Sequence, residues 1–319
     1  MNQLYKILIS IPTKNRPEYI NYYLQSVLPK MNLDCAIYIY DSSENNLTRN
    51  VILKYASYKN LYYKKLDCKT EINSKTYKCL QCEIKSEYLW LCSDKIVIDP
   101  LIINHISRAV SKHSYSIIVV SNRDKKNLKN KVYYDKKLLF NDCAWDMTLY
   151  GSTILNRKNV NLKEEKYYLN NYPNNIFSLP FYFDNDMEIE KFLFMSINYY
   201  LPNLHDLSSS WSNEVFFTFI HEWLRIINLL PNEYGDYKRK VIKEHGILSG
   251  LFTYKSFVRH RSNNNLNLKL YKEYSTEFHK VTNVNKYYIL GLCFIPKNLI
   301  KSLLKIWDLI NRGKINEDN

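Results

Sequence analysis

The chain has 319 residues, of which 46% are hydrophobic, enough to bury a sizeable core in one large domain or two ordinary ones. Its 45 lysines and arginines exceed its 31 aspartates and glutamates, and the formal net charge of +14 favours anionic partners such as phosphorylated substrates or acidic lipids. The six glycines form neither a G-x-G-x-x-G nor a P-loop pattern, and no familiar nucleic-acid-binding motif occurs, so we expect no nucleic-acid partner.

We expect a cytoplasmic protein. No secretory leader precedes the first apolar run, and no apolar stretch approaches the ~20 residues that a membrane-spanning helix needs. The seven cysteines are an odd number scattered along the chain, which favours reduced thiols over a disulfide framework. The C-x-x-C of Cys79 and Cys82 falls in a predicted helix and lacks a second cysteine pair, so we do not expect a zinc site there.

Apolar strands and amphipathic helices alternate along the first half of the chain. Residues 6–12 form a near-continuous apolar run that ends in proline, as in strands buried on both faces of a parallel sheet. Asn15 to Glu18 then reads as a helix start, with proline in the first turn. The same patterns predict strands at 36–40, 60–64, 88–92 and 116–120, and helices at 72–84 and from Pro100 onward.

This alternation predicts an α/β fold with a right-handed, mostly parallel sheet, in which ligands bind beyond the carboxyl ends of the strands. Polar clusters follow three of the predicted strands, at 13–16, 41–43 and 93–95. Their carboxylates would bind ribose hydroxyls, and Lys14, Arg16 or Lys95 would bind phosphate oxygens. Together the clusters predict a nucleotide site, although each one alone is also explained as a solvated turn.

Three stretches resemble the nucleotide-sugar glycosyltransferases of family 2, including those that build bacterial surface glycans. They are ISIPTKNRPEYINYYLQSVL, IYIYDSSENN and KSEYLWLCSDKIVIDP, in that order. The family typically carries I-P-T-x-N-R-P, an Asp after the second strand, and a D-x-D after a G/S-E-Y-I/L-W strand. The resemblance implies the GT-A fold, a Rossmann-like, mixed and mostly parallel sheet flanked by helices, for residues 1–200, followed by a mainly helical region at 201–319.

The resemblance also implies a set of residues that bind the sugar nucleotide: Pro12, Thr13, Asn15, Arg16, Asp41, Ser93, Asp94 and Lys95. Asp41 would contact the base or the ribose, and Asp94 would be the first acid of the D-x-D and a metal ligand.

The second acid of that motif is missing, because Ile96 stands where the family has a metal-ligating acid. In the usual mechanism Mg²⁺ or Mn²⁺ neutralises the departing diphosphate. Three possibilities stay open. Asp94 binds a metal together with water and a later side chain, Lys95 or another basic residue replaces the metal, or the enzyme is catalytically impaired.

Residues 141–156, NDCAWDMTLYGSTILN, resemble the segment that shapes the acceptor side of the pocket in the family. The resemblance implies that Trp145, Tyr150 and Gly151 contribute to acceptor binding. An aromatic ring suits the C–H face of a sugar, so Trp145 and Tyr150 would stack on one, with packing in the core as the alternative.

An inverting transfer needs a carboxylate that takes the proton of the acceptor hydroxyl. In the family this base lies well beyond the D-x-D, which here points to FYFDNDMEIE and to Asp184 and Asp186. Glu188 lies behind them, and Asp142 and Asp146 are further alternatives. An Asp-Asn-Asp string is also common as a loop or helix cap.

The last predicted helix, residues 296–314, is basic and amphipathic. Its apolar side carries Leu299, Ile300, Leu303, Ile306, Trp307 and Ile310, and its basic side Lys297, Lys301 and Lys305. Such a helix would dock on anionic lipid at the inner face of the cell membrane, which suits a lipid-linked acceptor, or would pack on its own domain.

We therefore expect an inverting hexosyltransferase that moves a sugar from a nucleoside diphosphate, with UDP as the first candidate, to a glycan or a lipid-linked saccharide. The alternatives are a catalytically impaired nucleotide-binding protein of the same fold and a basic nucleic-acid-binding protein.

Overall fold

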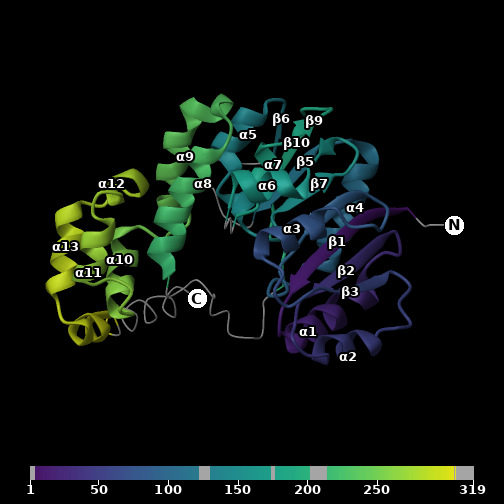
Figure 1. Cartoon of the computed structure of the whole chain (residues 1–319), viewed down its shortest axis with the longest axis horizontal. Helices are drawn as coiled ribbons and strands as arrows, with labels where there is room; N and C mark the ends of the chain where they lie inside the picture. Colours follow the sequence, from purple (N-terminus) through teal and green to yellow (C-terminus); the bar gives the residue numbers. More distant parts are fainter. Residues whose placement is uncertain (1–3, 122–129, 174–176, 202–213, 305, 307–319) are drawn as a thin grey trace, which may run out of the picture. The chain divides into compact units, whose positions relative to one another are not determined.

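The computed structural model describes residues 4–121, 130–173, 177–201, 214–304 and 306 (Figure 1). The chain divides into two compact units, which are Met1–Leu207 with Leu229–Tyr234 (unit 1) and Ser208–Asn228 with Gly235–Asn319 (unit 2). The domain boundary expected between residues 200 and 201 stays a prediction, because unit 1 is not one continuous segment and also includes Leu229–Tyr234. In the described ranges, no helix combines the length and hydrophobicity needed to cross a membrane.

Unit 1 is built around a mixed sheet of eight strands in the order β3-β2-β1-β4-β7-β5-β10-β6. β1, β2, β3 and β4 are parallel, as are β5 and β10, whereas β7 runs antiparallel to β4 and β5, and β6 antiparallel to β10. The strands are β1 (Tyr5–Thr13), β2 (Cys35–Asp41), β3 (Leu61–Lys65), β4 (Ser86–Leu91), β5 (Ile117–Ser121), β6 (Lys131–Tyr133), β7 (Thr153–Asn156) and β10 (Phe192–Ser196); β8 (Val160–Asn161) and β9 (Asp186–Met187) form a separate pair.

The buried strands β1, β2 and β4 supply the centre of the apolar core, as their near-continuous apolar runs predict. The helices of unit 1 are α1 (Pro17–Val27), α2 (Leu47–Leu53), α3 (Ile72–Leu80), α4 (Pro100–Lys112), α5 (Lys136–Cys143), α6 (Glu165–Asn171) and α7 (Leu179–Phe183). Figure 1 shows α3 beside the strands, and it packs against β1, β4 and α6. This packing brings one face of α3 towards the sheet.

Unit 2 is helical in its described residues. It contains a π-helical segment η4 (Phe217–Glu222), α8 (Trp223–Leu229, whose last residue falls in unit 1), α9 (Gly235–Leu248), α10 (Tyr254–Ser262), α11 (Leu268–Tyr274), α12 (Phe278–Val281), α13 (Lys286–Phe294) and a further helical stretch at 297–304. The rings of Phe216, Phe252 and Phe257 contact the ring of His260, and Phe278 packs against Phe216 and Phe257. Aromatic rings each bury a large apolar area, so this cluster contributes to the core of unit 2.

The predicted helix at 72–84 is shorter in the structure, because α3 ends at Leu80. Beyond it the guanidinium of Arg157 donates to the main-chain oxygens of Cys82 and Ile84, which holds this stretch out of the helix. Cys82 thus lies outside the helix that was expected to contain it. Cys79 and Cys82 are buried free thiols, and the described residues contain no cluster of three metal-ligating side chains.

Candidate functional site

The polar clusters that follow β1, β2 and β4 meet at one edge of the sheet. β1 lies between β2 and β4, all three are parallel, and Thr13 pairs with Asp41 in register. The Oγ1 of Thr13 donates to Oδ2 of Asp94 at 2.8 Å, and Nη1 of Arg16 lies 3.0 Å from Oδ1 of the same carboxylate. Asp94 is only 3% exposed, so this carboxylate is held from two sides.

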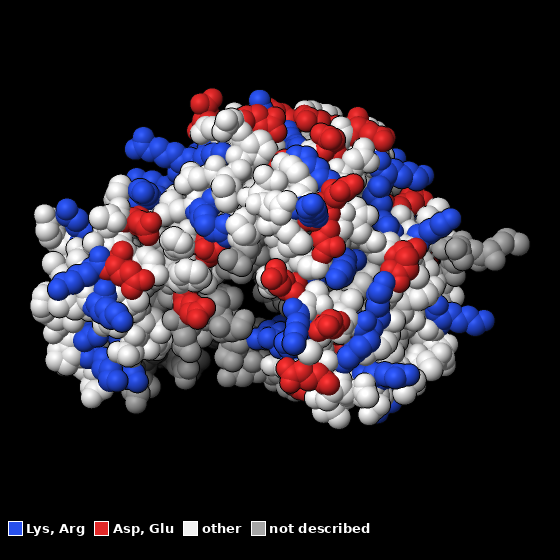
Figure 2. Space-filling model, viewed as in Figure 1, with Lys and Arg blue, Asp and Glu red and all other residues white. Residues whose placement is uncertain are grey.

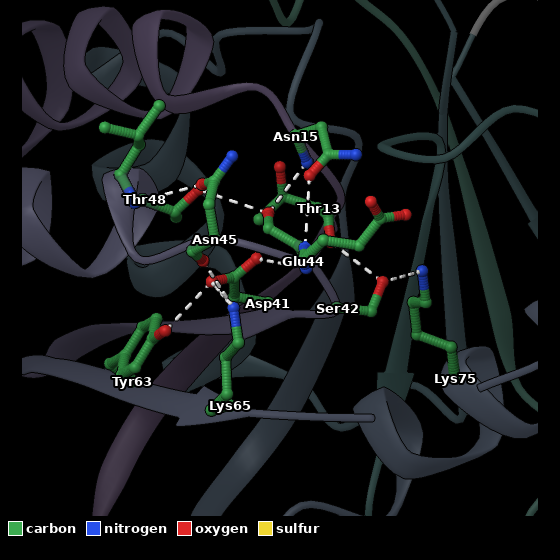
Figure 3. A network of polar contacts seen from close by, with 12 residues as sticks. Thr13, Asn15, Asp41, Ser42, Glu44, Asn45, Thr48, Tyr63, Lys65 and Lys75 are labelled. Carbon is green, nitrogen blue, oxygen red and sulfur yellow. Dashed lines mark hydrogen bonds and ion pairs between the residues drawn. The ribbon is translucent and has the colours of Figure 1, made fainter. Parts of the chain in front are cut away.

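Asp41 is a buried carboxylate with three donors (Figure 3). The main-chain N–H of Ser43 donates to it at 2.8 Å, the hydroxyl of Tyr63 at 2.9 Å and Nζ of Lys65 at 3.1 Å. Burial alone raises the pKa of Asp41, but the hydrogen bonds from Ser43, Tyr63 and Lys65 outweigh it and hold the pKa below its usual value. The group is therefore an ionised acceptor at neutral pH.

The loop after β1 is attached to the loop after β2. Asn15 has a left-handed backbone, with φ of 55°, which asparagine tolerates better than most residues. Its main-chain N–H donates to Oγ of Ser43 at 2.7 Å, and its Oδ1 accepts from the N–H of Glu44 at 3.3 Å (Figure 3). Pro12 lies one residue before Thr13, in register with Tyr40. The first and second clusters are thus joined by direct hydrogen bonds.

Lys75 contacts the second cluster, although it was not among the site residues expected from the sequence. It lies on α3, and its Nζ donates to Oγ of Ser42 (Figure 3). Burial lowers the pKa of Lys75, and repulsion from Lys14 lowers it further. Attraction to Asp94 and Asp41 acts in the opposite direction. The helical pattern indicated that residue 75 lies in a helix, but no local signal showed which face of that helix would meet the sheet edge.

The third cluster forms a tight turn after β4. The main-chain N–H of Lys95 donates to Oγ of Ser93 at 3.1 Å, and that of Ile96 to the oxygen of Ser93 at 3.3 Å. Ile96 packs against the apolar core of the sheet. A divalent cation prefers several oxygen ligands. Here Ile96 packs against the core and offers no ligand, and the described residues contain no cluster of three metal-ligating side chains, so they do not by themselves form a site for such an ion.

The segment expected at the acceptor side lies next to this turn. Gly151 donates its N–H to the oxygen of Leu91, the last residue of β4, at 2.7 Å, and its own oxygen accepts from Nε1 of Trp90 at 2.8 Å. The hydroxyl of Tyr150 lies 2.6 Å from Oγ1 of Thr76, which follows Lys75 on α3. Trp145 is only 5% exposed, so Tyr150 is the more accessible of the two aromatic candidates.

Asp184, a candidate base, has a carboxylate that is held by three side chains. Lys163 and Tyr172 form short contacts with it, and the hydroxyl of Tyr167 donates at 2.8 Å. Burial raises the pKa of Asp184, but the hydrogen bonds from Lys163, Tyr172 and Tyr167 outweigh it and lower the pKa below its usual value. A carboxylate so stabilised in its ionised form is a weak proton acceptor.

The other candidate carboxylates are spread over unit 1. Asp186 is exposed on β9, opposite Asn161, and Glu188 follows it. Asp142 accepts from the hydroxyl of Tyr133 at 2.9 Å and from Nζ of Lys131 at 3.1 Å. Asp146 accepts from Oγ of Ser121, the last residue of β5, at 2.8 Å.

Asp146 is thus the candidate that the topology places at the carboxyl edge. It begins the 3₁₀ turn η2 (Asp146–Thr148), and its carboxylate contacts Ser121 at the end of β5. The N–H of Leu149, two residues before Gly151, donates to the main-chain oxygen of Asp146, and the N–H of Gly151 donates to the oxygen of Leu91. This short path joins Asp146 to the edge that carries Asp94.

A scan against protein-family models and a search of curated proteins both find no match. Among solved structures, the chain is similar to residues 1–349 of Staphylococcus aureus TarS in complex with UDP-GlcNAc, with 15% identity, a TM-score of 0.51, and coverage of 86% of this chain and 78% of that chain. A longer TarS structure gives 13% identity and a TM-score of 0.50 over 81% of this chain and 47% of that one. This chain therefore spans about half the length of that longer structure.

A mannosyltransferase from Pyrobaculum calidifontis, solved with GDP-Man and Mn²⁺, is also similar, at 8% identity and a TM-score of 0.43 over 91% of this chain and 86% of that chain. The similarity to the TarS structures confirms the fold expected from the sequence. The chain has a GT-A-type fold, a mixed and mostly parallel sheet flanked by helices.

Proposed function

We propose that this protein is a glycosyltransferase that moves a sugar from a nucleoside diphosphate to a hydroxyl acceptor. The observation that carries the proposal is the joint network of Thr13, Asp41 and Asp94, which come from the ends of three strands and lie on one edge of the sheet. In open α/β sheets this edge is the usual ligand site.

The charges at this edge suit the two ends of a nucleoside diphosphate. Asp41 is an ionised, buried acceptor and would bind the N–H of a base or a ribose hydroxyl. Lys14, Arg16 and Lys95 would contact the diphosphate, as the sequence pattern predicts. UDP is the first donor to test, because the TarS structure with the same fold was solved with UDP-GlcNAc.

We further propose an inverting transfer. The acceptor oxygen forms a bond to the anomeric carbon while the bond to the diphosphate breaks, and a carboxylate takes the hydroxyl proton. Asp184 and Asp186 are the candidates from the sequence. Asp146 was a further alternative from the sequence, and its contact with Ser121 at the end of β5 now supports it as a third candidate.

We propose a glycan or lipid-linked saccharide as acceptor, with contact to anionic lipid through the C-terminal helix. Of the expected apolar face, Ile300 is buried, whereas Leu299 and Leu303 are 52% and 56% exposed. Part of the apolar face expected there thus packs on the protein, and part of it is exposed to solvent. Lys305, Trp307 and Ile310 lie outside the described residues. Co-sedimentation with vesicles containing anionic lipid, compared with neutral vesicles and with the Leu299→Ser/Leu303→Ser variant, tests this contact.

The function is tested by release of UDP from a panel of UDP-sugars, with and without candidate saccharide acceptors. Acceptor-dependent release that is lost in Asp94→Asn supports the proposal. UDP binding without turnover of any donor would favour the catalytically impaired nucleotide-binding protein. Tight, salt-dependent binding of random oligonucleotides without UDP affinity would favour a nucleic-acid binder.

On the face shown in Figure 2, basic and acidic side chains are interspersed, without one continuous basic stripe.

A further inference from the structure

The donor proposed above presents a charge problem at this site. When the bond from the anomeric carbon to the diphosphate breaks, its electron pair stays on the phosphate oxygen, and the added negative charge needs a counter-charge. Asp94 is engaged by Thr13 and Arg16, and Ile96 faces the apolar core where a second acid would be needed. The described residues thus contain no cluster of three or more metal-ligating side chains, and Asp94 has no second acid beside it to help hold a divalent ion that would supply that charge.

Lys75 stands out among the basic side chains around this edge. Arg16 is paired with Asp94, Lys65 lies 3.1 Å from Asp41, and Nζ of Lys14 donates to the main-chain oxygen of Cys68 at 3.0 Å. Lys75 instead donates to a neutral hydroxyl, that of Ser42. Among the described residues, no carboxylate lies within ion-pair distance of its Nζ.

We propose that the ammonium group of Lys75 neutralises the diphosphate of the donor in place of a divalent cation, so that the nucleotide binds without metal. This inference rests on the proposed function. Lys75 is half-buried, and Ser42, which orients it, follows directly on Asp41. Figure 3 shows Nζ of Lys75 at Ser42, in the same network as Asp41, so we place the phosphates of a ligand whose nucleoside contacts Asp41 beside this ammonium group.

The electrostatic surroundings of Lys75 support the same role. Lys14 and Lys75 repel each other at this edge, and burial weakens the hydration of the Lys75 ammonium. A diphosphate placed between two such cations removes the repulsion and replaces the lost hydration, and charge interactions are stronger in a partly desolvated site than in water. Lys75 donates hydrogen bonds throughout and transfers no proton.

Calorimetric titration with UDP and with uridine, each in EDTA and in Mn²⁺, tests the proposal. We expect the wild type to bind UDP in EDTA within about threefold of its affinity in Mn²⁺. Lys75→Gln should weaken UDP binding by about 10- to 100-fold, the usual effect of a charged hydrogen bond, and leave uridine binding unchanged. Lys75→Arg should retain most of the affinity for UDP, since it keeps the positive charge. This variant also checks that the fold tolerates a substitution at residue 75.

Lys78→Gln is the matched control, because Lys78 lies on the same helix three residues further on. UDP binding that needs Mn²⁺, or equal UDP affinities for Lys75→Gln and Lys78→Gln, would overturn the role of Lys75 and leave the proposed function standing. No binding of UDP, GDP or ADP by the wild type in either condition would overturn the proposed function and the inference together.

Discussion

The hydroxyl of Thr13 donates to the carboxylate of Asp94 at 2.8 Å, although 81 residues separate them in the chain. Both side chains are buried, and each lies at the end of its own strand or just beyond it. The bond therefore joins the first and third polar clusters directly. Because a neutral donor and a guanidinium share this carboxylate, its orientation is set before any ligand arrives, which is what a preorganised site requires.

Asp94→Asn should lower the transfer rate by about 100-fold or more, since the amide cannot accept from both Thr13 and Arg16 and its N–H₂ opposes one of them. Transfer assays with purified variants measure this, and Asp67→Asn, an exposed carboxylate on a loop, is the control. An Asp94→Asn variant with full activity would remove Asp94 from the mechanism.

Asp41→Asn should weaken UDP binding and also change the acid stability of the protein. The pKa of Asp41 lies below 3.8 in the folded state, so its ionised form stabilises the fold above that pH, and this contribution disappears as the pH falls through the folded pKa. The difference in free energy of unfolding between wild type and variant should therefore hold from pH 7 down to the usual Asp pKa of ~3.9, and narrow as the pH falls below it. A difference that stays constant below that pH would contradict the role given to the ionised carboxylate.

Gly151→Ala should destabilise unit 1 by about 1–3 kcal/mol, because the backbone φ of 103° is strained for a residue with a Cβ. The added Cβ would also lie 3.3 Å from Cε2 of Tyr199. Gly235→Ala is the matched control, since a Cβ there meets no atom within 4 Å. Chemical denaturation measures both variants, and equal stabilities would show that the turn beside Leu91 tolerates alanine.

Asp184→Asn and Asp146→Asn should separate a structural carboxylate from a catalytic one. Removing the charge of Asp184 leaves Lys163 without its partner and should lower the free energy of unfolding by about 2–3 kcal/mol. Asp146→Asn should lower transfer by about 100-fold if it is the base. Thermal denaturation alongside transfer assays distinguishes them, with Asp186→Asn as a third variant. A folded, inactive Asp184→Asn protein would instead identify the base expected from the sequence.

His260 should make unit 2 less stable in mild acid. It is buried, its Nε2 lies 2.8 Å from the oxygen of Leu251, and burial lowers its pKa below 6.5. Well above pH 6.5 the ring is neutral in both the folded and the unfolded state. As the pH falls below that value, the unfolded chain takes up a proton before the folded one does, so the free energy of unfolding decreases.

Melting temperatures between about pH 7 and pH 5 should therefore fall more for wild type than for His260→Gln. The exposed His279→Gln is the control, and it should follow the wild type. An unchanged slope in His260→Gln would assign the acid sensitivity to another group.

Much of unit 1 follows from the sequence alone. Apolar runs that end in polar residues predicted the first and last residues of β1, β2 and β4 to within two positions. They could do so because burial on both faces of a strand imposes a local apolar pattern. Parallel strands bring their carboxyl ends to one edge, so the sequence alone predicts that Thr13, Asp41 and Asp94 lie together.

Other features depended on contacts between distant segments, which carry no local pattern. The antiparallel insertion of β7 between β4 and β5, and the bonds of Arg157 that end α3, arise only when the chain is packed. The same holds for Lys75, whose sequence neighbours indicate a helix but not the strand end that it faces. Hydrophobic periodicity determines which side of an element is buried, whereas the pairing of individual charges is decided by how the elements pack in three dimensions.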